Sequence, residues 1–207
     1  MEPVVGVLLA GGLGRRMGGG DKPLNLLGGK PLLAHMIERA APQVDVLILN
    51  ANGDTARFDN YNLPVIADVV EGFAGPLAGI HSALQWTQDN YPRAKWVVSF
   101  ATDAPFFPVT MVEKFHQAQR THVAQIVCAQ SHGRDHPVFA LWSVGLVDAL
   151  LKAMVDENLR KIDLWTSRFV THRVNFDRLT DPIDPFFNIN RPEDLVSAEQ
   201  WIENLNT

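Results

Sequence analysis

A glycine-rich segment that follows a buried apolar strand constrains this chain more than any other feature of its sequence. Residues 4–9 (VVGVLL) form a continuous apolar run, which is typical of a strand whose two faces are both covered. Residues 11–20 contain six glycines, which let a backbone turn freely and let its N–H groups approach phosphate oxygens. Arg15, Arg16 and Lys22 add positive charge. We therefore expect this segment to bind phosphate groups of a ligand.

The two common phosphate-binding motifs are absent from this segment. A P-loop needs lysine and then serine or threonine directly after its last glycine. Gly14 and Gly19 have the P-loop spacing, but glycine and aspartate follow them. A dinucleotide fingerprint beginning at Gly12 would need glycine or alanine at position 17, where Met17 stands. The chain is therefore expected to be neither an ordinary P-loop enzyme nor an ordinary dehydrogenase.

Strand-like and helix-like patterns alternate along the chain. Further apolar runs predict strands at 44–49, 64–67, 96–100 and 124–128, and helical periodicity predicts helices at 31–41, 76–86, 109–120, 144–155 and 192–205. Such alternation is typical of crossover units around a mainly parallel sheet. The predicted fold class is therefore α/β with a mainly parallel sheet, and residues 1–207 are expected to form a single domain.

Polar residues follow several of these strands, where the ligand crevice of an open parallel sheet lies. Asp103 comes directly after the run at 96–101 and is predicted to bind Mg²⁺, which favours carboxylate oxygens and substrate phosphates. Capping of the turn before Pro105 is the alternative for Asp103. Asn50, Asn52 and Asp68 follow two further strands. They are candidates for ligand contacts or for simple turn residues.

A second glycine-rich stretch, residues 72–79, leads into a predicted helix. The N–H groups of Gly75 and its neighbours are candidates to hydrogen-bond a base or a ribose. The alternative is a helix start whose small residues permit tight packing.

Composition excludes several classes of function. The formal net charge of -5 gives no overall positive field for nucleic acid. The single cysteine, Cys128, allows no internal disulfide, favours a reducing, cytoplasmic setting, and is expected in the core. No stretch approaches the roughly 18 apolar residues of a membrane span. Four histidines are expected at surface or half-buried positions: His81, His116, His122 and His172.

Taken together, the motifs resemble those of the molybdenum cofactor guanylyltransferases, the MobA family. The resemblance runs nearly end to end and in order, and it is carried by Leu9-Ala10-Gly11-Gly12, Arg16-Met17-Gly18-Gly19, Asp21-Lys22, Gly29-Lys30-Pro31-Leu32, Asn50-Ala51-Asn52, Asp68, Gly75-Pro76-Leu77-Ala78-Gly79, Thr102-Asp103-Ala104-Pro105, Arg134-Asp135-His136-Pro137 and Phe187-Asn188-Ile189-Asn190. One departure is Thr102-Asp103-Ala104, where relatives often have Cys-Asp-Thr; the carboxylate itself is kept.

The resemblance implies a three-layer, Rossmann-like nucleotidyltransferase fold. It implies transfer of GMP from GTP to molybdenum-molybdopterin with release of pyrophosphate. It implies catalytic roles for Arg16, Lys22 and Asp103, with Mg²⁺ as cofactor on Asp103. The implied binding residues are Leu9, Ala10, Gly11, Gly12, Lys22, Asn50, Asp68, Gly75, Asp103, Asn188 and Asn190. It also allows transient contacts with proteins of cofactor biosynthesis or molybdoenzyme maturation, and it implies no nucleic-acid or membrane partner.

Several alternatives remain open at this point. The chain could be a molybdopterin cytidylyltransferase, a sugar-phosphate nucleotidyltransferase or a GTP-binding adaptor without catalysis. His136 is a candidate for contact with the pterin phosphate or for a structural role at a strand entry. Asn190 could instead cap the last helix, with Glu193 completing a capping box.

Overall fold

Seven strands form one sheet in the order β5-β4-β1-β6-β8-β7-β9. The structure is a computed structural model that describes residues 2–11, 21–70, 72, 75–177 and 183–205. The strand bounds are β1 (Val4–Leu9), β4 (Val46–Asn50), β5 (Val65–Ile66), β6 (Trp96–Ala101), β7 (Ile126–Ser131), β8 (Arg134–Ser143) and β9 (Thr171–Asn175). Every neighbouring pair in this sheet is parallel except the two pairs that involve β8. The prediction of a mainly parallel sheet is confirmed.

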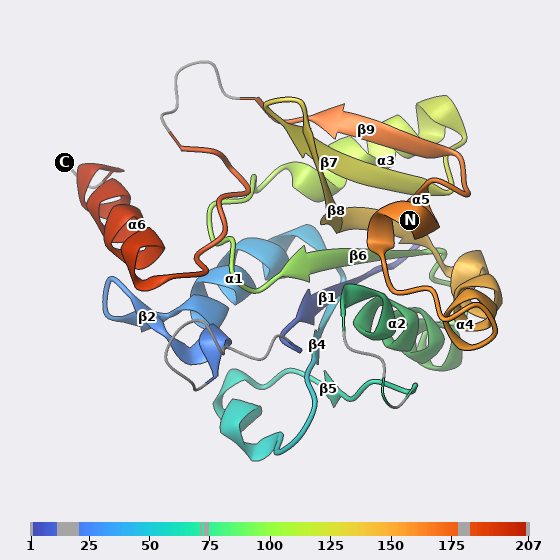
Figure 1. Cartoon of the computed structure of the whole chain (residues 1–207), viewed down its shortest axis with the longest axis horizontal. Helices are drawn as coiled ribbons and strands as arrows, with labels where there is room; N and C mark the ends of the chain where they lie inside the picture. Colours follow the sequence, from blue (N-terminus) through green and yellow to red (C-terminus); the bar gives the residue numbers. More distant parts are fainter. Residues whose placement is uncertain (1, 12–20, 71, 73–74, 178–182, 206–207) are drawn as a thin grey trace.

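Helices cover both faces of this sheet (Figure 1). The helices are α1 (Leu32–Ala40), α2 (Pro76–Asn90), α3 (Met111–His122), α4 (Val147–Val155), α5 (Ile162–Thr166) and α6 (Pro192–Leu205), with short 3₁₀ turns η2 (Lys22–Leu24), η3 (Ala41–Gln43), η4 (Ala56–Tyr61) and η5 (Val144–Leu146). Met36 of α1 and Phe115 of α3 belong to one core cluster, while Ile80 of α2 and Leu150 of α4 belong to another. Burial of apolar side chains on both faces gives the three predicted layers.

The last helix, α6, packs on a third and smaller apolar cluster. The small antiparallel pair β2 (Leu26–Leu27) and β3 (Lys30–Pro31) lies beside α6 in Figure 1. This cluster contains Leu27 of β2, Leu32 of α1, Ile189 and Ala198, the last of which lies in α6. Trp201 of α6 packs against it. The C-terminal segment is thereby held next to the residues that follow the glycine-rich segment.

Two strands of the sheet, β8 and β9, were not predicted. Pro137 and the charged pair Arg134 and Asp135 hide the strand pattern of β8. Between the pairs Cys128↔Ala140 and Ala129↔His136, three residues of β8 lack a partner in β7. The sequence of β9, THRVN, is mostly polar because it forms a sheet edge.

The chain reverses its direction across the sheet at β1. It passes from β1 to β4 and β5 on one side, and then crosses to β6 on the other side. Leu9, the last residue of β1, is paired with Asn50 of β4 and with Ala101 of β6. Ligands of open parallel sheets bind beyond the carboxyl ends of the strands at such a switch point. None of the described helices is long and apolar enough to cross a membrane.

Candidate active site

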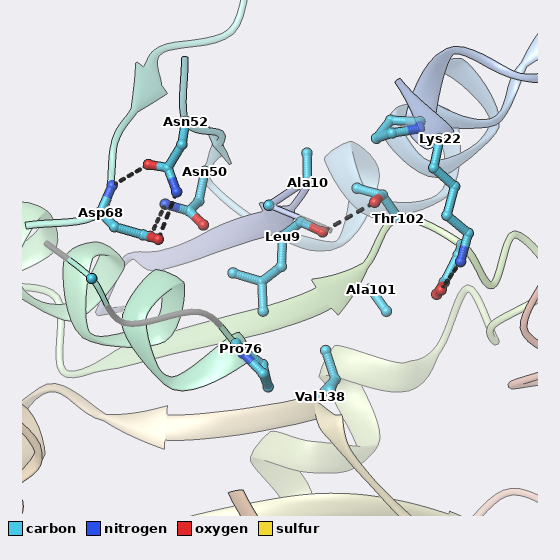
Figure 2. Close-up of a pocket in the computed structure, with 15 residues that line it drawn as sticks. Leu9, Ala10, Lys22, Asn50, Asn52, Asp68, Pro76, Ala101, Thr102 and Val138 are labelled. Carbon is cyan, nitrogen blue, oxygen red and sulfur yellow. Dashed lines mark hydrogen bonds and ion pairs between the residues drawn. The ribbon is translucent and has the colours of Figure 1, made fainter. Parts of the chain in front are cut away.

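A pocket of about 750 Å³ opens at the carboxyl ends of β1, β4 and β6. Its lining residues are Leu9, Ala10, Gly11, Lys22, Pro23, Asn50, Asn52, Asp68, Gly72, Gly75, Pro76, Ala101, Thr102, Asp103 and Val138. Its volume is within the range of small-molecule sites. Figure 2 shows Lys22 on one side of Leu9 and Ala10, and Asp68 with two asparagines on the other side. The pocket therefore has two polar ends and an apolar middle.

The first end is built around the Lys22 ammonium group. Its Nζ atom lies 2.5 Å from Asp103 Oδ2 and 2.6 Å from Asn190 Oδ1. The backbone N–H of Ile189 donates to the carbonyl of Asp103 at 2.7 Å, which fixes the C-terminal segment beside the end of β6. The Lys22 and Asp103 side chains are 15% and 23% exposed, so their attraction is only partly screened by water. This end presents a cation to a ligand that enters the pocket.

The second end is built around the Asp68 carboxylate. Asn50 Nδ2 donates to Asp68 Oδ1 at 3.0 Å, and Asn52 Nδ2 donates to Asp68 Oδ2 at 2.7 Å. The backbone N–H of Asp68 donates to Asn52 Oδ1 at 2.9 Å, so Asn52 and Asp68 form a reciprocal pair. Each carboxylate oxygen keeps a further lone pair for a donor of the ligand. This end is therefore a fixed hydrogen-bond acceptor.

Backbone and small side chains shape the middle of the pocket. Thr102 Oγ1 donates to the carbonyl of Leu9 at 3.0 Å and ties the end of β6 to the end of β1. Helix α2 approaches closely because Gly79 has no side chain. A Cβ atom at Gly79 would lie 2.3 Å from Asn50 Oδ1 and 2.8 Å from Leu9 Cδ2. The interpretation of this glycine as a tight-packing residue agrees with these distances.

The structure brings most of the predicted binding residues to this one pocket. Leu9, Ala10, Gly11, Lys22, Asn50, Asp68, Gly75 and Asp103 all line it. Asn190 reaches it through its hydrogen bond to Lys22. Asn188 is half-buried, and it is not among the residues that line the pocket. The predictions for Gly12 and Arg16 concern residues outside those that the structure describes.

The alternative in which Asn190 caps the last helix is not what the structure shows. Helix α6 begins at Pro192, and Asp194 Oδ2 accepts the backbone N–H groups of Asn190 and Arg191, both at 2.8 Å. The carboxylate that reaches back is therefore Asp194 rather than Glu193. Asn190 is free of the capping role because its side-chain oxygen accepts from Lys22.

Oxygen atoms suited to a divalent cation meet at the Lys22 end of the pocket. Asp103 Oδ2 and Asn190 Oδ1 lie around the same positively charged group. Carboxylate and amide oxygens are hard ligands, and Mg²⁺ is usually held by one or two of them together with substrate phosphates. Over the described part of the chain, no cluster of three or more His, Cys, Asp or Glu side chains offers a complete metal site. The residues present thus fit a metal that arrives with a phosphorylated ligand.

Val138 and Arg57 are two residues near the pocket that sequence reasoning missed. Val138 reaches the pocket from the stretch of β8 that is unpaired with β7. Arg57 lies in η4 and contacts residues behind both polar ends. Only the Pro137 in β8 signalled an irregular strand. A lone arginine in a loop gave no signal at all.

His136 has contacts that support the structural alternative, and it is not among the residues that line the pocket. Its ring stacks on Phe186 with centroids 4.6 Å apart, and its Nε2 lies 2.7 Å from Ser131 Oγ. Ser131 Oγ donates in turn to Asp184 Oδ1 at 2.8 Å. Burial lowers the pKa of His136, which favours the neutral ring. Cys128 is in the core as predicted, and burial raises its thiol pKa to about 12, which leaves it unreactive.

This chain matches known proteins over most of its length. A model of the MobA-like NTP transferase domain matches residues 6–169. A Nitrobacter hamburgensis protein named Molybdenum cofactor guanylyltransferase is 50% identical over 200 residues, which cover 97% of this chain and 95% of that protein. A Rhodopseudomonas palustris (strain HaA2) protein of the same name is 50% identical over 193 residues, 93% of this chain and 89% of that protein.

A solved structure shares the fold. Molybdopterin-guanine dinucleotide biosynthesis protein A from Archaeoglobus fulgidus superposes with a TM-score of 0.77 at 24% identity, over 97% of this chain and 99% of that chain. At this identity the likeness establishes the fold alone. The three-layer, Rossmann-like prediction is confirmed by it.

Proposed function

The chain belongs to the family of MobA-like NTP transferase domains, and from that premise we propose that it transfers GMP from GTP to molybdenum-molybdopterin, releasing pyrophosphate. The observation that carries this proposal is that one pocket has both a cationic end at Lys22 and an acceptor end at Asp68. Relatives named Molybdenum cofactor guanylyltransferase at 50% identity over nearly the whole chain support it.

The Asp68 end suits guanine. The Watson–Crick edge of guanine carries two adjacent donors, N1–H and the 2-amino group, and a carboxylate accepts both side by side. Cytosine has an acceptor at the middle of that edge and would face the carboxylate with a lone pair. We therefore assign the base to the end formed by Asp68, Asn50 and Asn52, with Gly75 and Pro76 as its wall.

The Lys22 end suits the triphosphate. The Lys22 ammonium would stabilise negative charge on the reacting phosphates, and Arg16 and the Gly11-Gly12 backbone would add further donors. Asp103 and Asn190 would hold Mg²⁺, which when bound neutralises charge on the triphosphate. Manganese is present in the solved complex of a Mycobacterium tuberculosis H37Rv protein with the same fold, at a TM-score of 0.70 and 18% identity over 96% of this chain and 98% of that chain.

The reaction is an in-line displacement at the α-phosphorus of GTP. An oxygen of the molybdopterin phosphate forms the new bond, and the bond to the β-phosphate breaks as pyrophosphate leaves. The attacking oxygen is already ionised near neutral pH, so no strong general base is needed. The chain contributes mainly positioning and charge neutralisation. Three expectations stay predictions. They are ligand binding by Asn188, the cytoplasmic location, and transient contacts with proteins of cofactor biosynthesis or molybdoenzyme maturation.

A nucleotide panel tests this function. The protein is incubated with Mg²⁺, molybdenum-loaded molybdopterin and one of GTP, CTP or UTP, and the product is identified by mass spectrometry. We expect a guanine dinucleotide product from GTP alone. A product from CTP would indicate a cytidylyltransferase. In a parallel incubation with a sugar phosphate in place of molybdopterin, a product would indicate another acceptor class. Binding of GTP without any product would indicate a non-catalytic adaptor.

A further inference from the structure

Arg57 lies behind the pocket and contacts residues that support both of its ends. It belongs to the short helix η4, whose side chains do not line the pocket among the described residues. Its Nε lies 2.9 Å from Asp21 Oδ2 in an ion pair, and its Nη2 donates to the carbonyl of Asn52 at 2.9 Å. Its Nη1 donates to the carbonyl of Asp54, and its guanidinium lies over the Phe58 ring at 4.6 Å. One side chain therefore gathers a carboxylate, two carbonyls and an aromatic face.

Arg57 is linked to the base end of the pocket through Asn52. The Asn52 side chain holds both the carboxylate and the backbone N–H of Asp68. Asn52 is exposed and follows the end of β4, so its own backbone has little other support from the sheet. The Arg57 contact to the Asn52 carbonyl supplies such support. Loss of it would free the residue that sets the orientation of Asp68.

The same side chain leads to the phosphate end through Asp21. Asp21 directly precedes Lys22, whose ammonium lies between Asp103 and Asn190. The Arg57–Asp21 ion pair ties the start of η2 to η4, with the Arg57 side chain 25% and the Asp21 side chain 40% exposed. Two hydrogen bonds to backbone carbonyls hold the Arg57 guanidinium in place, so the ion pair keeps its position although water partly screens it. It therefore limits where Lys22 can place its charge.

We propose that Arg57 is a positioning residue that joins the base end and the phosphate end of the nucleotide pocket and so helps to set the preference for guanine. The proposal rests on the proposed function, because it takes GTP as the ligand. Arg57 acts through Asn52 and Asp21 and does not itself contact the nucleotide. Lysine cannot replace it, because a single ammonium does not reproduce the planar fork that serves three separate partners.

The test compares GTP with ITP, whose base lacks the 2-amino group of guanine. Dissociation constants for both nucleotides with Mg²⁺ are measured by calorimetry for the wild type, Arg57→Ala and Arg57→Lys. We expect both variants to bind GTP about tenfold more weakly and to lose most of the preference for GTP over ITP, as for a weakened hydrogen bond to a charged group. The matched control is Arg168→Ala, which removes the exposed Arg168–Glu157 ion pair. It is expected to leave both constants unchanged.

A double-mutant cycle tests the link to the phosphate end. Asp21→Asn and Arg57→Lys are measured alone and together, and we expect their effects on GTP binding to be clearly non-additive. An unchanged GTP-to-ITP ratio in folded Arg57→Lys, or additive effects in the cycle, would overturn the proposal. A wild-type protein that does not bind GTP would instead refute the proposed function. Thermal unfolding curves show whether each variant is folded. If Arg57→Ala does not fold, Arg57→Lys alone tests the proposal.

Discussion

At the scale of single residues, the pocket depends on close contacts between groups that are far apart in sequence. Lys22 and Asp103 are separated by 81 positions and Lys22 and Asn190 by 168, yet one ammonium contacts both. Asn50 is only 2% exposed and sits between Asp68 and the backbone of α2. Small changes at these positions are therefore expected to alter ligand binding more than stability.

Replacing Gly79 with alanine is expected to disturb the base end. The new Cβ would lie 2.3 Å from Asn50 Oδ1, so the amide that holds Asp68 must move. GTP binding should weaken about tenfold, as when a hydrogen bond to a charged group is lost. The control is Gly145→Ala, whose Cβ meets only Ser143 Oγ at 3.6 Å, an ordinary contact. Calorimetry of both variants checks this, and equal GTP affinities for them would contradict the account of Gly79.

His81 makes stability depend on pH. The surface or half-buried position expected for it is wrong: the ring is 1% exposed, and neither nitrogen has a hydrogen-bond partner. Burial lowers its pKa below the ordinary 6.5, although Asp148 partly opposes this. The unfolded chain therefore binds more protons than the folded one below about pH 6.5, and stability falls as the pH falls through that value.

The corresponding variant is His81→Leu, which cannot be protonated. We expect its free energy of unfolding to fall less between about pH 7 and pH 5 than that of the wild type. Urea unfolding at a series of pH values measures this, with exposed His122→Gln as the control. Buried His136 and half-buried His116 and His172, whose pKa values are also lowered, leave a remaining slope in every variant. Identical pH profiles for His81→Leu and wild type would contradict the assignment.

At the scale of elements, continuous apolar runs predicted the central strands and the placement of polar residues at their ends. Parallel strands buried on both faces are almost wholly apolar, and this makes β1, β4 and β6 plain in the sequence. Edge strand β9 and irregular β8 lack that signal, because one is polar and the other contains Pro137. The pairing of Lys22 with Asn190 could not be predicted, since it depends on where α6 packs.

The start of α6 offers a clean comparison between two adjacent acidic residues. Asp194 accepts two backbone N–H groups, whereas Glu193 was the residue expected from the sequence to reach back. We expect Asp194→Ala to lower the stability of the protein by about 1 kcal/mol, as for the loss of a helix cap. Glu193→Ala should change it by less than about 0.5 kcal/mol. Chemical denaturation of both variants measures this. A larger loss of stability in Glu193→Ala than in Asp194→Ala would instead support a capping box with Glu193.

At the scale of the whole molecule, one sheet carries the two large core clusters on its opposite faces. We propose that residues 1–207 are a single domain, because the same strands contribute side chains to both clusters. Unfolding should then be cooperative. Tryptophan fluorescence reports on Trp142 and Trp165 in one cluster and on Trp201 within α6, and circular dichroism reports on the helices. We expect the two transitions to coincide, and separate midpoints would indicate independent units.

The division of the pocket into a base end and a phosphate end is tested most directly by single-turnover GMP transfer in Asp103→Asn. This change keeps the size of the side chain but removes the charge that faces Lys22 and that would hold the proposed Mg²⁺. The account predicts that transfer to molybdenum-molybdopterin falls about a hundredfold or more, while the preference for GTP over ITP in binding stays at the wild-type value. Near-normal transfer would contradict the account. So would a variant that loses both the transfer activity and the preference for GTP over ITP.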